Sequence, residues 1–234
     1  MARSPGDQLA DWEIERYSSD LTYTEGNPDA AMTAHLTTQG LVIPLIEAIL
    51  AKDPDVHSVL NIGVYIGNVD HYLAAKHPDI AFTGVDFWRD LDQANEPLLL
   101  PNFKVVRGYP LEDIEADTVS GDIAFFSSTA TRIKNAELRR YIRSLAKRGT
   151  QYLIFNEPLF PLADGTIPNP RMTDPEKSTP IILYPVDSGD KDGGYPPCLC
   201  HNYPAIVTDR YEVIYSRLIH QPNPRFLMVA KRRT

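Results

Sequence analysis

Cysteine is scarce in this sequence of 234 residues: only Cys198 and Cys200 are present, with one residue between them. Two cysteines so close in sequence do not bridge easily, which argues against a disulfide framework and favours a reducing compartment. The length allows one large α/β domain, or one domain with a sizeable insertion. Composition thus indicates an ordinary globular fold rather than a small domain stabilised by disulfide bonds.

Long apolar runs are also missing, and no segment approaches the roughly 20 residues of a transmembrane helix. The first residues, MARSPGDQLADWEIE, are polar and acidic where a signal peptide has an apolar core. We therefore expect a cytoplasmic protein with no membrane partner.

Basic residues are fewer than acidic ones: the sequence has 23 lysines and arginines and 31 aspartates and glutamates, which gives a net charge of -8. Such a balance argues against a nucleic-acid groove. The local basic cluster at Leu138–Arg143 has the apolar spacing of an amphipathic helix with a solvated basic face. We expect a small-molecule partner; the sequence does not fix the oligomeric state, and a homodimer is compatible with it.

The chain is organised around residues 58–87, which read SVLNIGVYIGNVDHYLAAKHPDIAFTGVDF. An apolar run leads to a turn with Gly63 and Gly67, then to a helical segment and to a second apolar run that ends at Asp86. This order is typical of a nucleotide-binding βαβ unit. The alternative is an ordinary tight turn followed by a surface Asp.

Each part of that unit has a physical reason. Gly63 lets the backbone turn sharply and approach a ligand. The helix after Gly67 directs free N–H groups and its positive dipole end at the turn. Asp86, about 20 residues beyond the turn, is placed to accept both hydroxyls of a ribose.

The alternation of strands and helices continues along the chain. Further strands are predicted at residues 103–106, 122–126 and 151–155, a helix at 135–147, and two closing strands at 211–219 and 226–231. The two closing strands must be antiparallel, because their connection is too short for a parallel crossover.

Two helical patterns precede the first strand, so residues 1–55 are predicted to form an N-terminal helical cap and 56–234 the α/β domain. Between Glu157 and Pro204 lie ten of the chain's twenty prolines. A long segment without periodicity is usually a lid or binding loop, so 157–204 is predicted to be a functional insertion.

This arrangement resembles the class I S-adenosylmethionine-dependent methyltransferases, over about residues 58–233. Their first motif is an acid followed by three alternating glycines; here Gly63 and Gly67 match the outer glycines, Tyr65 replaces the middle one and Asn61 replaces the acid. The resemblance implies a Rossmann-like α/β fold: a doubly wound, seven-stranded, mostly parallel sheet with a C-terminal antiparallel hairpin.

The resemblance also implies S-adenosylmethionine as the cofactor and a set of binding residues. Gly63, Tyr65 and Gly67 would carry its methionine part, and Asp86 its ribose. Phe87 would lie against the adenine and Tyr109 near its amino group. Ser127 and Ser128 would line the rim where cofactor and substrate meet.

His201 and Glu157 are the candidate catalytic residues. A histidine with a pKa near 6.5 can take a proton at neutral pH, and His201 ends the proline-rich insertion. Glu157 directly follows a predicted strand, at the end where ligands of open parallel sheets bind. The alternatives are a histidine that caps a helix or bonds a loop, and a loop carboxylate.

A zinc site from Cys198, Cys200 and His201 would need a fourth ligand and better spacing. Magnesium-dependent members of the resembled family use acids after the fourth strand, where this chain has Ser127, Ser128 and Thr129. We predict no metal.

The sequence thus predicts methyl transfer from S-adenosylmethionine to a small polar acceptor, with O-methylation of a sugar or secondary metabolite in natural-product biosynthesis as its form. The alternative is a non-catalytic binding or regulatory module of the same fold, because Asn61 and Tyr65 depart from the motif. A nicotinamide dehydrogenase fits poorly, since Gly-x-Gly-x-x-Gly is absent.

Overall fold

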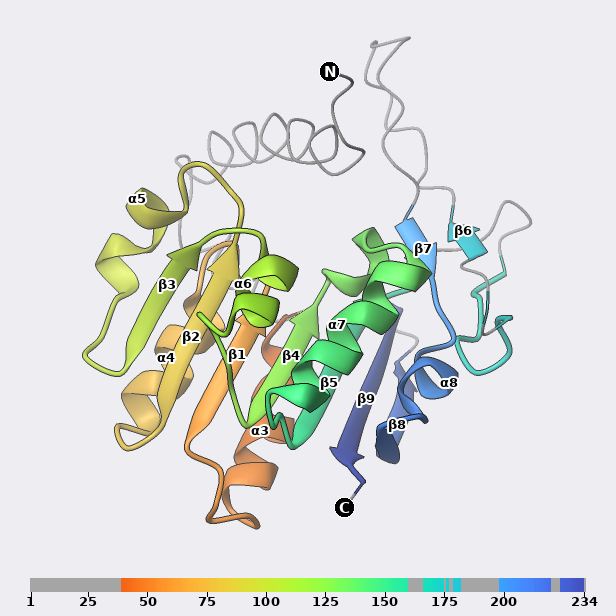
Figure 1. Ribbon diagram of the computed structural model, residues 1–234, viewed down its shortest axis with the longest axis horizontal. Coiled ribbons are helices and arrows are strands. Elements are labelled where there is room, and N and C mark those ends of the chain that lie inside the picture. The colour runs from red at the N-terminus through yellow and green to blue at the C-terminus, as the bar shows by residue number, and fades with distance from the viewer. Residues whose placement is uncertain are drawn as a thin grey trace, which may run out of the picture. The chain divides into compact units, whose positions relative to one another are not determined.

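A computed structural model describes residues 39–159, 166–174, 176, 179–181, 198–219 and 224–233. The chain divides into two compact units, Met1–Gly121 and Asp122–Thr234. Seven strands form a sheet in the order β3-β2-β1-β4-β5-β9-β8, as predicted for the doubly wound fold (Figure 1). The first 38 residues of the predicted helical cap, and most of the proline-rich insertion, lie outside the described residues.

The first unit contains the βαβ segment. Its described elements are η1 Gln39–Val42, α3 Ile43–Leu50, β1 Ser58–Ile62, α4 Asn68–Lys76, β2 Ala81–Asp86, α5 Leu91–Asn95, η2 Glu96–Leu98, β3 Phe103–Arg107 and α6 Pro110–Ala116. β1, β2 and β3 pair in parallel, and Ile62 lies opposite Val85 while Asp86 lies opposite Arg107. The carboxyl ends of the three strands therefore meet at one edge of the sheet. In Figure 1, α4 lies behind these strands and α6 in front of the sheet.

Helix α6 begins and ends at local signals in the sequence. Pro110 begins the helix within its first turn, where a missing N–H is harmless. Asp117 then ends it in the left-handed conformation, with φ of 65°.

The second unit carries the antiparallel part of the sheet. Its described elements are β4 Ile123–Ser127, η3 Ala130–Arg132, α7 Asn135–Lys147, β5 Tyr152–Pro158, β6 Thr179–Ile181, β7 Cys198–Cys200, α8 Tyr203–Val207, β8 Tyr211–Ile219 and β9 Arg225–Arg232. β4 and β5 are parallel, whereas β9 is antiparallel to both β5 and β8. The predicted closing hairpin is confirmed. A small second sheet, β6 with β7, was not predicted.

Aromatic packing builds the core of the second unit. Phe126 of β4 stacks on Phe155 of β5 with ring centroids 5.1 Å apart, and Tyr141 of α7 meets Phe126 edge-on at 5.8 Å. α7 lies across these strands in Figure 1 and buries an apolar stripe that includes Leu138 and Leu145. Among the described helices, none has the length and apolar character needed to cross a membrane.

Candidate functional site

The predicted glycine turn follows β1 in the first unit. Gly63 has φ of 79°, in the region that favours glycine, and its N–H donates to the carbonyl of Val85 at 2.9 Å. Tyr65, which stands where the resembled motif has a glycine, also has a positive φ of 50°. Its backbone N–H donates to Oδ2 of Asp86 at 3.0 Å, so the end of β2 fixes the middle of the turn.

The side chain of Tyr65 is accommodated outside the backbone of the turn. Its ring packs on Trp88 with centroids 4.8 Å apart, beside a buried cluster of Val64, Trp88 and Leu91. This packing offsets the cost of a left-handed conformation in a residue other than glycine. The missing middle glycine therefore does not prevent the turn from forming.

Asn95 of α5 holds the two sides of the turn together. Its buried Oδ1 accepts the N–H of Gly67 at 2.7 Å, and its Nδ2 donates to the carbonyls of Tyr65 at 2.8 Å and Leu91 at 2.9 Å. Sequence reasoning missed Asn95 because it lies 28 residues beyond Gly67 in a helix with no motif. The N–H of Gly67 is thereby committed to a protein partner.

Gly67 is required for packing rather than for an unusual backbone angle. Its φ of -77° suits any residue. A Cβ at this position would lie 2.5 Å from Cζ of Phe103 and 3.1 Å from Oδ1 of Asn95. The start of α4 can therefore approach β3 and α5 only without a side chain.

Asp86 sits at the carboxyl end of β2 with 8% of its surface exposed. Oδ2 accepts the N–H of Tyr65, and Oδ1 accepts that of Trp88 at 3.2 Å. Burial raises the pKa of Asp86, while these backbone N–H groups oppose the rise. Because an ionised carboxylate has about four acceptor positions, each oxygen keeps capacity for one further hydroxyl donor.

Two aromatic rings lie next to Asp86. Phe87 and Tyr109 stack with centroids 5.7 Å apart and planes 17° from parallel. Tyr109 is 41% exposed and Phe87 partly buried, so the pair presents an aromatic surface to solvent. Such a surface suits the face of a flat heterocycle.

A buried polar pair lies beneath the turn. Nδ2 of Asn61, at the motif's acid position, donates to Oδ2 of Asp70 on α4 at 2.6 Å. Oδ1 of Asn61 and Oδ1 of Asp70 are both buried and have no hydrogen-bond partner among the residues that the structure describes. Burial raises the pKa of Asp70 to about 7, although the Asn61 bond opposes this. A carboxyl group of α4 thus lies next to the residue at the motif's acid position.

The second unit gathers polar groups at the carboxyl ends of β4 and β5. Arg225 is buried; its Nε donates to Oδ1 of Asn156 at 2.6 Å and its Nη2 to Oγ of Ser128 at 2.7 Å. Nδ2 of Asn156 donates to Oγ of Ser127 at 2.9 Å. The two predicted serines therefore belong to one network. Asn156 and Arg225 also belong to this network, but the sequence did not predict them, because Arg225 lies 69 residues from Asn156 along the chain.

Glu157 is completely buried at the end of β5. Its Oε1 accepts the N–H groups of Thr129 at 3.3 Å and Ala130 at 3.1 Å, and its Oε2 accepts that of Thr131 at 3.2 Å. Burial raises its pKa to about 7, opposed by these N–H groups and by the charge of Arg225. The carboxylate thus holds the start of η3.

His201 lies at the other side of the same short helix. Its Nε2 is 3.1 Å from the carbonyl oxygen of Ala130, which accepts a hydrogen bond when this nitrogen carries the proton. The side chain is fully buried, and burial lowers its pKa to about 4. The two candidate catalytic side chains therefore contact the same residue: Glu157 accepts from the N–H of Ala130, and His201 contacts its carbonyl oxygen.

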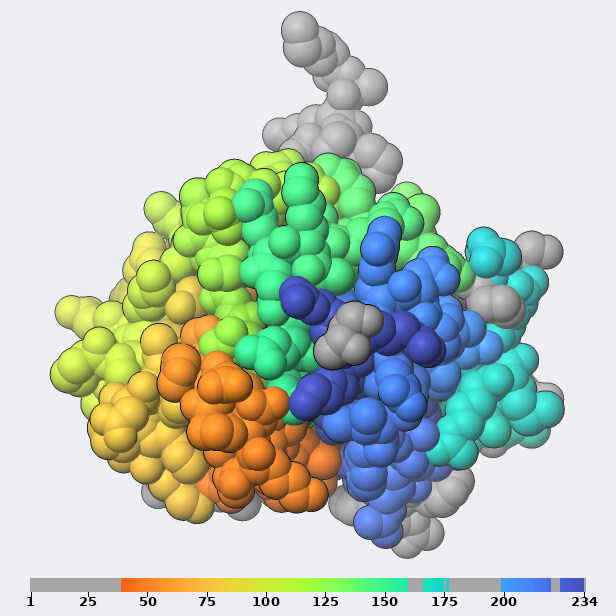
Figure 2. All heavy atoms as spheres, turned by 60° about the horizontal axis from the view of Figure 1, so that its bottom comes forward, coloured from red at the N-terminus to blue at the C-terminus, as the bar shows by residue number. Residues whose placement is uncertain are grey.

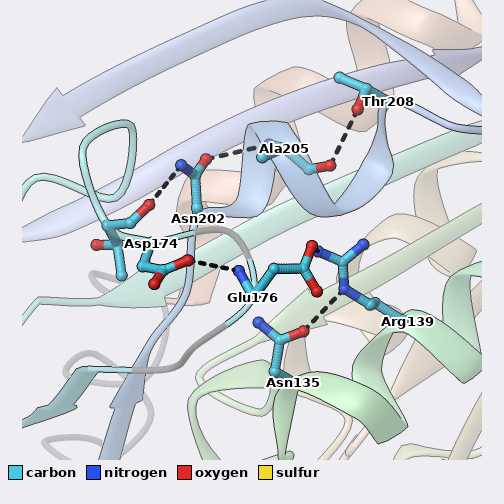
Figure 3. A network of polar contacts seen from close by, with 8 residues as sticks. Asn135, Arg139, Asp174, Glu176, Asn202, Ala205 and Thr208 are labelled. Carbon is cyan, nitrogen blue, oxygen red and sulfur yellow. Dashed lines mark hydrogen bonds and ion pairs between the residues drawn. The ribbon is translucent and has the colours of Figure 1, made fainter.

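The described part of the insertion is attached to α7 and α8 (Figure 3). Nδ2 of Asn202 donates to the carbonyl of Thr173 at 2.6 Å, while its Oδ1 caps α8 by accepting the N–H of Ala205 at 3.1 Å. Nη2 of Arg139 lies 3.2 Å from Oε1 of Glu176. These contacts fix the return of the chain toward the sheet.

No group of three or more His, Cys, Asp or Glu side chains in the described part of the chain is arranged to hold a metal ion. Cys200 is buried, with its Sγ 3.7 Å from Oγ1 of Thr173, and burial raises the pKa of its thiol. The side chain of Cys198 lies outside what the structure describes.

Sequence comparison gives no relative: no protein-family model matches, and no curated protein matches significantly. Solved structures do match in fold. The N-terminal domain of EvdMO1 with SAH bound has a TM-score of 0.52 at 13% identity over 88% of this chain and 82% of that one. The same domain in the presence of SAH and D-fucose gives 0.53 at 13% identity.

Two further structures show the same relationship. An O-methyltransferase family protein from Burkholderia thailandensis has a TM-score of 0.56 at 15% identity, covering 88% of this chain but only 59% of that one. Magnesium protoporphyrin IX methyltransferase from Synechocystis with bound SAH has a TM-score of 0.53 at 15% identity, covering 82% and 83%. The chain therefore has the class I methyltransferase fold, which confirms the predicted fold class.

Proposed function

We propose that this protein binds S-adenosylmethionine in its first unit and transfers the methyl group to a small polar acceptor. The observation that carries the proposal is the placement of Asp86 at the end of β2, bonded through Oδ2 to the turn that contains Gly63 and Tyr65. Each oxygen of this carboxylate retains an acceptor position for a ribose hydroxyl.

The neighbouring groups fit the rest of the cofactor. The stacked Phe87 and Tyr109 offer a surface for adenine. Oδ1 of Asn61 and Oδ1 of Asp70 are buried acceptors that no described residue hydrogen-bonds, and they suit the donors of an ammonium group. The backbone N–H of Gly67 is not available to the cofactor, because it already donates to Oδ1 of Asn95.

S-adenosylmethionine supplies an activated methyl group, so the chain's task is to hold the two reactants in line and to exclude water. A hydroxyl acceptor must in addition lose a proton. Complete burial and a pKa of about 4 favour His201 as a positioning residue of η3, together with Glu157. The role of general base, expected for His201 from the sequence, stays a prediction.

O-methylation of a sugar or a secondary metabolite is the acceptor class that we propose. Its support is the likeness in fold to an O-methyltransferase family protein and to a domain solved with D-fucose present. The acidic chain favours neither nucleic acid nor an anionic surface as acceptor. A cytoplasmic location and a homodimer remain predictions of the sequence.

Calorimetry on the full chain with S-adenosylmethionine tests the binding step. We expect saturable binding that Asp86→Asn weakens at least about tenfold, since the negative charge is lost and one of the two acceptor oxygens is replaced by an NH2 donor. Asp92→Asn is the matched control, an exposed acid on nearby α5, and should bind as the wild type does. Absence of binding at high cofactor concentration would reject the proposal.

Transfer of a labelled methyl group to a panel of sugars and phenolic or hydroxylated metabolites tests the second step. Binding of the cofactor without turnover on any acceptor would favour the alternative of a non-catalytic binding module. That alternative is motivated by Asn61 and Tyr65, which depart from the resembled motif.

A further inference from the structure

Five basic side chains surround a hollow of about 550 Å³ in the second unit. They are Arg143 and Lys147 of α7, Arg210 after α8, and Arg232 and Arg233 at the end of β9. Figure 2 shows the end of β9 in dark blue between the green of α7 and the lighter blue of the segment around α8. The hollow lies at the opposite end of β5 from Glu157, about 20 Å along the strand at 3.3 Å per residue.

The charge of the hollow is unbalanced. Among the described residues that line the hollow, Asp209 is the one acid beside the five cations, so these six side chains together carry four positive charges, in a chain whose net charge is -8. None of the five cations forms an ion pair with another described residue. Like charges held close together repel each other, and an anion bound among them would remove that repulsion.

Two of the guanidinium groups are held in place by the backbone. Nη1 of Arg232 donates to the carbonyl of Ala146 at 3.3 Å, and Nε of Arg233 donates to the carbonyl of Tyr211 at 3.3 Å. Each group has five N–H donors, so most of them remain available. A guanidinium that is already oriented loses less entropy when it binds an anion.

Compensation of the α7 macrodipole explains only part of the cluster. Cations in the last turn of a helix are stabilised by its negative end, which accounts for Lys147 and for the Arg232 contact to Ala146. Arg210 and Arg233 lie outside α7, so its macrodipole does not explain their position at the hollow. The convergence of three elements on one hollow needs a further explanation.

We propose that this hollow binds a small molecule that carries two or more phosphate groups. Its volume falls within the range of small-molecule sites, about 300–1,000 Å³. Arginine side chains bind phosphate oxygens in pairs, and several of them match several phosphates. A nucleic acid fits less well, since the described residues that line the hollow include no aromatic side chain for base stacking and the chain as a whole is acidic.

Calorimetry on the full chain with orthophosphate, pyrophosphate and inorganic triphosphate tests this proposal. We expect one saturable site whose affinity rises along that series and falls with added salt. Replacing both Arg210→Gln and Arg233→Gln should weaken triphosphate binding at least about tenfold. Asp209→Asn should tighten it about threefold by removing the one opposing charge, a gain that misfolding cannot produce.

Arg217→Gln is the matched control, since Arg217 is an exposed arginine of β8 that does not line the hollow. It should leave the affinity unchanged. Equal weakening by this control, or binding of many anions per chain, would show diffuse attraction and overturn the proposal. If a single-stranded oligonucleotide binds more tightly than triphosphate, the hollow is part of a nucleic-acid surface instead. If no anion binds saturably, the hollow is not a binding site.

Discussion

Asn95 and Gly67 are joined by a hydrogen bond of 2.7 Å, in which the side-chain oxygen of Asn95 accepts the backbone N–H of Gly67. The same side chain donates to the carbonyl of Tyr65, so one amide connects both sides of the proposed cofactor turn. The turn therefore depends on α5, which follows it only after another strand.

Asn95→Leu should destabilise the protein by about 2–4 kcal/mol, because the buried N–H of Gly67 loses its acceptor and the carbonyls of Tyr65 and Leu91 lose the donor on Asn95. Cofactor affinity should fall with it. Urea denaturation measures the change, with Gln93→Leu on the exposed side of α5 as the control. Equal stability of the two variants would contradict this role of Asn95.

Gly67→Ala should be destabilising because of one identifiable ring. The added Cβ would lie 2.5 Å from Cζ of Phe103, so the ring must move. We expect a loss of about 1–3 kcal/mol, part of which Phe103→Leu restores when the two changes are combined. A double-mutant cycle by chemical denaturation measures this coupling. Strictly additive losses would show that the ring is not the obstacle.

Asp70→Asn should stabilise the protein at alkaline pH. The folded pKa of Asp70, about 7, exceeds its usual value of 3.8, so the folded state binds more protons between these values and loses stability as the pH rises through them. Asparagine cannot ionise, and its NH2 group can donate to the unpaired Oδ1 of Asn61. We expect a gain on the order of 2 kcal/mol at pH 8.

The corresponding measurement is the free energy of unfolding of both proteins from pH 4 to pH 8. The two curves should diverge as the pH rises toward 7 and then run parallel. A constant difference across this range would mean that Asp70 does not change its protonation there.

His201→Gln should make the protein less sensitive to acid. The folded pKa of His201, about 4, lies below its usual value of 6.5, so the wild type loses stability as the pH falls from about 6.5 toward 4. Glutamine keeps an N–H for the carbonyl of Ala130 but takes up no proton. The difference between the variants should change by about 2–3 kcal/mol over this range in thermal or chemical denaturation.

The same variant separates the two roles of His201. Turnover that survives in His201→Gln would show a positioning residue, whereas cofactor binding without turnover would show a general base. Loss of both, with the variant still folded, would place His201 in the support of the binding site.

Arg225→Gln should destabilise the protein more at pH 8 than at pH 5. Arg225 donates to Asn156 and Ser128 at any pH, and its charge additionally opposes the raised pKa of Glu157. Above the Glu157 pKa of about 7 the buried carboxylate is charged and loses its nearby cation. Denaturation at the two pH values measures the difference, with Arg217→Gln on exposed β8 as the control.

Most of the fold could be predicted because its signals are local. Neighbouring residues alone predict the strands, as apolar runs bounded by glycine, and the helix at 135–147, from its amphipathic period. The short link between β8 and β9 likewise predicts that these two strands pair in antiparallel fashion. The pair β6–β7 could not be predicted in this way, since its strands have three residues each and lie in a segment without periodicity.

The site was predictable only where a motif marks it. Gly63 and Asp86 are recognisable from their spacing, and the structure joins their segments through the N–H of Tyr65. Asn95 and Arg225 have no motif, because their partners are brought to them by folding and lie 28 and 69 residues away.

The sequence by itself determined the order of strands and helices, the glycine turn and the acid that ends β2, since each depends on residues close along the chain. Only the tertiary structure decided which polar groups are buried and what they contact. Burial in a medium of low polarity moves the pKa values of Asp70 and Glu157 upward and that of His201 downward. Such shifts depend on atoms far apart in sequence, which no local pattern encodes.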